Sequence, residues 1–128
     1  MDRLTPREAR TAVARALETG TAPEGLPAAQ LLRHGSMTLY FYEPRGEDRQ
    51  PPHDQDELYV VVSGSGSFVL DDGEGRLQRS PFGSGDAIFV PAGAIHRFED
   101  FTDDFETWVI MYGPVDGEAA EPGVQSGR

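Results

Sequence analysis

The chain has 128 residues, a formal net charge of −11 and no cysteine. This length fits one domain with a hydrophobic core of its own, and the lack of cysteine excludes a disulfide framework and a thiolate zinc site. Because phosphate binding needs clustered Lys and Arg, the charge argues against a nucleic-acid partner. We expect no membrane partner and a cytoplasmic location, since residues 1–4 lack the apolar run of a signal peptide and no segment is apolar enough to span a bilayer.

The first predicted element is a helix over residues 5–18. Thr5 is a favourable N-cap, Pro6 suits the first helical position and Glu8 completes a capping box. Gly20 ends the helix. Small apolar residues recur at helical spacing: Ala9, Ala12, Val13, Ala16 and Leu17. Because this stripe is built of small side chains, we expect the helix to pack on the outside of another element.

From residue 36 onward the pattern becomes strand-like. Runs rich in aromatic and β-branched residues predict strands at 36–42, 58–62, 67–70, 87–90, 96–101 and 107–112. The Ser-Gly repeat at 63–67 predicts a hairpin turn rather than a phosphate loop, because no lysine follows it. Many short strands with regular turns indicate a sandwich or a small barrel. We expect an N-terminal helix and extended arm at 1–35, a β-barrel at 36–114 and a flexible acidic tail at 115–128.

Two separated histidine segments carry the candidate chemistry. In the first, period-2 alternation puts His53 on the same face as Glu57 if the segment is extended. The second ends at His96, after a proline–glycine turn that returns the chain to the barrel with Phe98 on the same face as His96. Two imidazoles and one carboxylate form a ligand set that suits a divalent first-row transition metal.

The spacing within the second segment resembles the second conserved motif of the cupin superfamily. The matching positions are Gly85, Pro91, Gly93 and His96. The motif ends at Asp100, where that family often has Asn.

The first segment resembles the second half of the first cupin motif. His53, Glu57 and Gly64 match it, but the first histidine of the usual His-x-His pair is missing. With the shorter family spacing its place is Pro51. With the longer spacing the pair falls on Gln50 and Pro52.

The resemblance implies an all-β fold: a double-stranded β-helix, or jelly-roll, cupin barrel with a short N-terminal helix. It also implies one metal held by His53, Glu57 and His96, with Gln50 or Gln55 as a weak fourth ligand. Iron is favoured because two histidines and one carboxylate match the facial triad of non-haem Fe(II) oxygenases, although Mn, Ni and Zn suit the same ligands. A homodimer is expected because small cupins are commonly dimers.

Two functional classes remain open. The first is a mononuclear metalloenzyme, an oxidoreductase resembling non-haem iron dioxygenases, that acts on a small, partly apolar molecule. Cupins also include isomerases, lyases and decarboxylases, so fold analogy does not choose the reaction. The second is a non-catalytic module that binds a small molecule or a metal, including a barrel that has lost its metal. In either class we expect Phe98, Trp108 and Tyr40 to line the cavity, with Tyr40 as a proton donor if it points inward.

Overall fold

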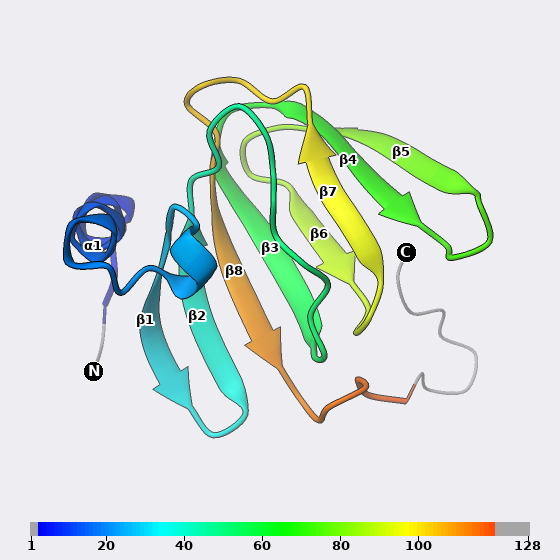
Figure 1. Ribbon diagram of the computed structural model, residues 1–128, viewed down its shortest axis with the longest axis horizontal. Coiled ribbons are helices and arrows are strands. Elements are labelled where there is room, and N and C mark those ends of the chain that lie inside the picture. Colours follow the sequence, from blue (N-terminus) through cyan, green and yellow to red (C-terminus); the bar gives the residue numbers. More distant parts are fainter. Residues whose placement is uncertain (1–2, 120–128) are drawn as a thin grey trace.

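The computed structural model describes residues 3–119, so residues 120–128 of the expected tail lie outside the described part. One α-helix, one short 3-10 turn and eight strands follow one another along the chain (Figure 1). Their bounds are α1 Pro6–Thr19, η1 Pro23–Gly25, β1 Ala28–His34, β2 Met37–Tyr42, β3 Asp56–Ser63, β4 Gly66–Asp71, β5 Leu77–Phe82, β6 Ala87–Val90, β7 Ile95–Glu99 and β8 Glu106–Tyr112. Within residues 3–119 there is no helix both long and apolar enough to cross a membrane.

The strands form two antiparallel sheets that face each other (Figure 1). The larger has the order β1-β2-β8-β3-β6 and the smaller β5-β4-β7. In the described part of the chain no ladder joins the two sheets, so the barrel is an open jelly roll rather than a closed cylinder. The predicted fold class, an all-β jelly roll with a short N-terminal helix, is confirmed.

Helix α1 covers the outer face of the larger sheet. The predicted capping box is present: the Thr5 side chain accepts a hydrogen bond from the Glu8 amide, and the Glu8 side chain accepts one from the Thr5 amide. Three residues of the predicted apolar stripe, Ala9, Val13 and Ala16, are buried in a cluster with Phe41 of β2, whereas Leu17 is exposed. An ion pair between Arg10 and Glu106 at the start of β8 adds a polar link between helix and sheet, with N–O distances of 2.6 and 2.8 Å.

The main core lies between the two sheets. Period-2 alternation turns Tyr59 of β3, Phe68 of β4 and Phe98 of β7 inward, and all three are buried. The Phe98 ring lies with its centroid 4.9 Å from that of Tyr59 and 4.7 Å from that of Phe105. This aromatic cluster fills one end of the barrel and leaves the other end to the histidines.

Two strands and one connection differ from the sequence prediction. Strand β1 was expected to be part of an extended arm, but it pairs with β2, and β5 was not predicted at all. The 63–67 segment does join two strands, but β3 and β4 belong to different sheets. The segment is therefore a crossover at the corner of the barrel, and the hairpin prediction is wrong.

Candidate metal centre

The two histidine segments meet between the sheets. His53 lies in the loop before β3, Glu57 is the second residue of β3 and His96 is the second residue of β7. Since β3 and β7 belong to opposite sheets, the fold brings together residues that are 39 positions apart in the sequence, from Glu57 to His96. One donor atom from each of the three side chains lies within 4.8 Å of the other two.

The turn between β6 and β7 fixes the loop that carries His53. The amide of Gly93 donates to the carbonyl of His53 at 2.7 Å, and the amide of Ala92 donates to the Asp56 carboxylate at 2.9 Å. Gly93 has φ 77°, a conformation that glycine adopts without strain. The proline–glycine turn of the second motif therefore positions the histidine of the first motif. Asp56 is buried in this structural role and holds no place among the three candidate ligands.

Both histidines contact the carboxylate of Glu57. His96 Nε2 lies 3.0 Å from Glu57 Oε1, and His53 Nδ1 lies 3.3 Å from the same oxygen. His96 Nδ1 lies 2.8 Å from the carbonyl of Ala94, which accepts its proton and turns Nε2 toward Glu57. A backbone carbonyl in this position is the usual partner that fixes the orientation of a metal-binding imidazole.

Charge is concentrated on this cluster. Burial raises the pKa of Glu57, but hydrogen bonds from His53 and His96 outweigh burial and hold that pKa at about 2. Burial lowers the pKa of His96, and its hydrogen bond and attraction to Glu57 reverse this, so the pKa is raised overall. Without a metal, the cluster is thus a carboxylate held by imidazole hydrogen bonds.

One atom of the cluster is left without a partner. Glu57 is 1% exposed, and its Oε2 is buried with no hydrogen bond in the described part of the chain. A buried acceptor left unsatisfied costs about 1–3 kcal/mol. A cation bound between the three side chains would satisfy Oε2, so the residues present fit a divalent metal with two nitrogen ligands and one carboxylate.

Gln50 is connected to the cluster through Tyr59. The Tyr59 hydroxyl donates to Gln50 Oε1 at 2.8 Å and lies 2.9 Å from His96 Nε2. The Gln50 amide nitrogen in turn donates to Asp48 at 2.8 Å. Gln50 therefore stands beside the candidate ligands with its orientation fixed from both sides.

Gln55 is placed differently from the sequence expectation. Its amide nitrogen donates to the backbone carbonyls of Ser36 and Gly113, at 3.0 and 2.9 Å. The chain bends at residues 54–55, and extended alternation begins only with Asp56. Of the two proposed fourth ligands, Gln50 is the one that contacts the cluster, through Tyr59.

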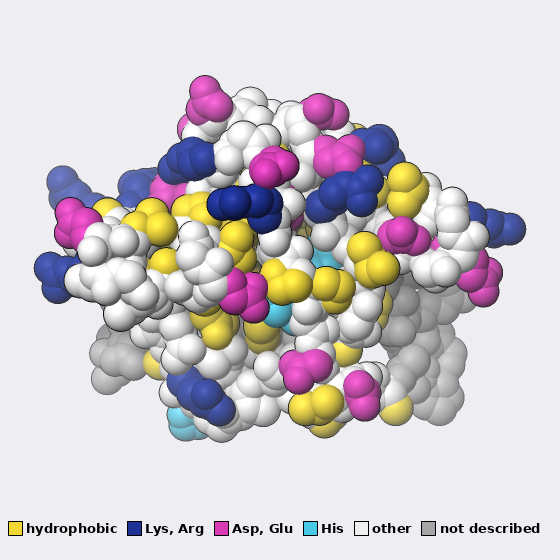
Figure 2. Space-filling model, in the orientation of Figure 1, with side chains coloured by type: hydrophobic (Ala, Val, Ile, Leu, Met, Phe, Trp, Pro, Cys, Tyr) yellow, Lys and Arg dark blue, Asp and Glu magenta, His cyan; other side chains and the backbone are white. Residues whose placement is uncertain are grey.

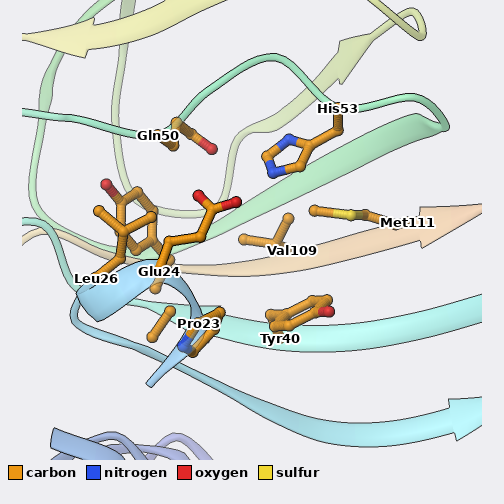
Figure 3. Close-up of a pocket in the computed structure, with 10 residues that line it drawn as sticks. Pro23, Glu24, Leu26, Tyr40, Gln50, His53, Val109 and Met111 are labelled. Atoms are coloured by element: carbon orange, nitrogen blue, oxygen red, sulfur yellow. The ribbon is translucent and has the colours of Figure 1, made fainter. Parts of the chain in front are cut away.

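A cavity of about 160 Å³ opens beside His53, one of the three candidate ligands. Figure 3 shows Gln50 and His53 projecting into it from the loop before β3, while Tyr40, Val109 and Met111 come from the strands of the larger sheet. Figure 2 shows histidine atoms at the surface among hydrophobic side chains near the centre of one face, with charged groups around them. The full lining is Pro23, Glu24, Leu26, Ala28, Tyr40, Tyr42, Gln50, His53, Val109 and Met111.

The three predicted lining residues have different outcomes. Tyr40 lines the cavity, and its hydroxyl donates to Gln30 at 3.3 Å. Trp108 does not: it packs on the opposite face of the sheet against Phe41, with ring centroids 4.9 Å apart, so that prediction is wrong. Phe98 faces inward as expected, but it is 1% exposed within the aromatic core and does not reach this cavity.

The wall of the cavity that comes from the N-terminal arm was not predicted from the sequence. Pro23, Glu24 and Leu26 belong to or adjoin η1, and no motif or period marks them. The only available signal was the Pro-Glu-Gly turn at 23–25. Tyr59 could have been found, because it shares the inward face of β3 with Glu57.

Comparison with known proteins supports the same interpretation of the fold. Residues 38–111 match the family described as Cupin domain. An uncharacterised protein of Streptomyces coelicolor is 32% identical over 87 residues, which is 66% of this chain and 78% of that protein. The acireductone dioxygenase of Drosophila melanogaster is 38% identical over 53 residues, or 41% of this chain, and the match spans only 28% of the dioxygenase.

Solved structures show the same architecture at low sequence identity. A Cupin 2 conserved barrel domain protein from Salinispora arenicola aligns with a TM-score of 0.59 and 18% identity, covering 88% of each chain. A Bacillus subtilis oxalate decarboxylase with Mn(II) centres aligns with a TM-score of 0.59 and 19% identity, covering 77% of this chain and 27% of that chain. At these identities the likeness concerns the fold alone.

Proposed function

We propose, since this chain belongs to the cupin domain family, that it is a mononuclear metalloenzyme. His53, Glu57 and His96 would hold one divalent transition metal, with Gln50 as a weak fourth ligand. The observation that carries the proposal is the buried, unpartnered Oε2 of Glu57, which lies in a cluster of three donor groups. A charged oxygen in that position needs a cation or a donor, and the two imidazoles already contact Oε1.

The chain's own residues would divide the work as follows. Such a metal, when bound with vacant positions, supplies a Lewis-acid or redox centre. His96 is held by the Ala94 carbonyl so that Nε2 faces Glu57, where it would be available to such a metal. The fully buried Tyr59 donates its hydroxyl proton to Gln50 Oε1 and keeps its hydroxyl oxygen 2.9 Å from His96 Nε2, so it positions Gln50 beside the candidate ligands.

The proposed reaction class is an oxygenase that acts on a small, partly apolar molecule. Two histidines and one carboxylate match the facial triad of non-haem Fe(II) oxygenases, which favours iron. The partial match to acireductone dioxygenases supports this choice, although it spans only 28% of the Drosophila melanogaster enzyme and 38% of the Schizosaccharomyces pombe enzyme. The Mn(II) centres of the oxalate decarboxylase keep manganese among the alternatives, together with nickel and zinc.

A second candidate is a non-catalytic small-molecule or metal-binding module. The observation that favours it is the direct contact of His96 and His53 with Glu57, because hydrogen bonds at 3.0 and 3.3 Å partly satisfy the carboxylate without a metal. The missing first histidine points the same way. This candidate predicts ligand binding in the cavity without turnover.

The first test is the metal content of protein purified without added metal, compared in wild type, Glu57→Gln and His96→Ala. His34→Ala is the matched control, because His34 is exposed and lies outside the cluster. We expect near-stoichiometric metal in wild type and control, and its loss in the two cluster variants. Little metal in wild type, even after reconstitution with Fe, Mn, Ni and Zn, would overturn the metalloenzyme. Oxygen uptake with a panel of enol and aromatic substrates then separates an enzyme from a binding module.

We also propose that the protein acts as a cytoplasmic homodimer with a small-molecule partner and no nucleic-acid or membrane partner. Light scattering behind a sizing column tests the dimer directly. A mass of twice the chain supports it, and the mass of one chain contradicts it.

A further inference from the structure

Besides Gln50 and His53, the cavity is lined by the charged side chain of Glu24. This residue lies in the 3-10 turn η1, which connects α1 to β1 and contributes Pro23 and Glu24 to the lining of the cavity. Figure 3 shows the Glu24 carboxylate directed into the cavity, toward the side that carries Gln50 and His53. No motif assigns a role to this residue.

The backbone at Glu24 is strained, and glycine would relieve the strain. Its φ is 54°, in the left-handed region that L-residues rarely adopt. The other described non-glycine residues with positive φ are Asp100 and Asp116. Short Asp side chains tolerate this region because they hydrogen-bond locally, whereas the longer Glu side chain lacks that compensation. Strained residues cluster at functional sites, which makes the Glu24 side chain a candidate for a role in the cavity.

The carboxylate of Glu24 is not engaged elsewhere. No ion pair among residues 3–119 includes it. Figure 3 shows an apolar surface formed by Val109 and Met111 on one side of Glu24 and Leu26 on the other. The cavity thus combines a free negative charge with an apolar wall in about 160 Å³, less than the roughly 300–1,000 Å³ common for drug-sized ligands.

We propose that Glu24 selects the ligand of this cavity: a small molecule with an apolar body and an ammonium or hydroxyl donor that the Glu24 carboxylate accepts. The apolar body packs on Val109 and Met111, and a carboxylate at the donor end is disfavoured by like charge. This inference deepens the proposed function and rests on that cavity being the substrate site. Its specific content is the charge preference, which does not require a bound metal.

The test uses metal-free protein and three probes of similar size: benzylamine, benzyl alcohol and benzoate. Affinities are measured by NMR titration for wild type, Glu24→Gln and Glu74→Gln. The control carboxylate Glu74 is exposed in the β4–β5 turn, away from the cavity lining. We expect wild type and control to bind the amine about fivefold more tightly than the alcohol, in line with an exposed charge pair, and the benzoate more weakly than either.

In Glu24→Gln the preference for the amine should disappear. Retention of the preference in this variant, or its absence in wild type, would overturn the inference. Thermal unfolding of Glu24→Gly distinguishes a ligand-selecting residue from a structural one: the melting temperature should stay level or rise as the strain is relieved, whereas a clear fall would contradict the role proposed here. Because the probes bind metal-free protein, a failed metal assay and a failed charge preference are separate results.

Discussion

Replacement of Gly64 by alanine tests why the first motif requires glycine at the corner of the barrel. Gly64 has φ 87°, and a Cβ there would lie 2.6 Å from the Cα of Phe105 and 2.8 Å from the hydroxyl of Thr102. The nearest contact is backbone, which cannot rotate away. Gly85 provides a matched control, because it has φ 89° but a Cβ there would have no atom within 4 Å.

Gly64→Ala and Gly85→Ala should share the cost of the left-handed backbone conformation and differ only by the steric clash at Gly64. The left-handed conformation costs an alanine about 1–2 kcal/mol, and the smaller entropy of the unfolded alanine chain returns about 0.4–1 kcal/mol. Gly85→Ala should therefore lose about 1 kcal/mol of stability. Gly64→Ala should lose about 1–3 kcal/mol more, because the new methyl group overpacks against Phe105.

Urea denaturation of both variants, followed by the fluorescence of the single tryptophan, measures these losses. The m-value should be unchanged, so the difference appears as a lower midpoint for Gly64→Ala than for Gly85→Ala. Equal midpoints would show that the corner relaxes at no cost and that the close approach of Phe105 does not explain the glycine.

Three further predictions concern Glu57 in the candidate metal centre, Phe41 beneath helix α1 and Asp48 in the loop before β3. The pKa of Glu57 is about 2 in the folded protein, against an ordinary value of 4.5. In metal-free protein this difference contributes about 3 kcal/mol to the free energy of unfolding, which is present above pH 4.5 and lost as the pH falls toward 2. Urea midpoints that stay constant between pH 4.5 and pH 2 would contradict this prediction. The Phe41→Ala variant should lose about 3–5 kcal/mol of stability, because Phe41 is fully buried between α1 and the sheet and contacts Trp108. The metal content of the folded variant should nevertheless stay at the wild-type level. Asp48→Ala removes one of the two groups that orient Gln50, so we expect stability to fall by about 1–3 kcal/mol and metal affinity by about tenfold or more. An unchanged affinity in a metal titration would show that metal binding does not depend on the contact between Asp48 and Gln50.

Local signals were sufficient where the chain itself fixes its conformation. The N-cap, proline and small-residue stripe of α1 act within a few residues, and that helix was predicted within one residue at each end. Strand β6 was predicted at its observed bounds, Ala87–Val90, because glycine and proline turns enclose a short apolar run. Such elements need no information about their partners.

The missed strands depend on their partners instead. The β1 sequence, AAQLLRH, is rich in residues that favour helices, and only its pairing with β2 makes it a strand. The β5 sequence, LQRSPF, is mostly exposed and contains Pro81, as is typical of an edge strand. Trp108 was misplaced for a related reason: β8 is apolar on both faces, so alternation gave no sign that Val109 rather than Trp108 faces the cavity.

The candidate site depends both on local sequence signals and on contacts between distant segments. Motif spacing predicted that His53, Glu57 and His96 would converge, and the structure places their donor atoms within 4.8 Å of one another. The Gly93 turn holds the loop that carries His53, while Glu57 and His96 lie on strands of opposite sheets. The cavity beside them takes one wall from η1, a segment outside both motifs. A segment that does not build the barrel can change at little cost to the fold, whereas a Cβ at Gly64 would collide with the backbone of Phe105. If the proposed roles are correct, the motif residues determine where the chemistry takes place, and Glu24 determines which molecule reaches it.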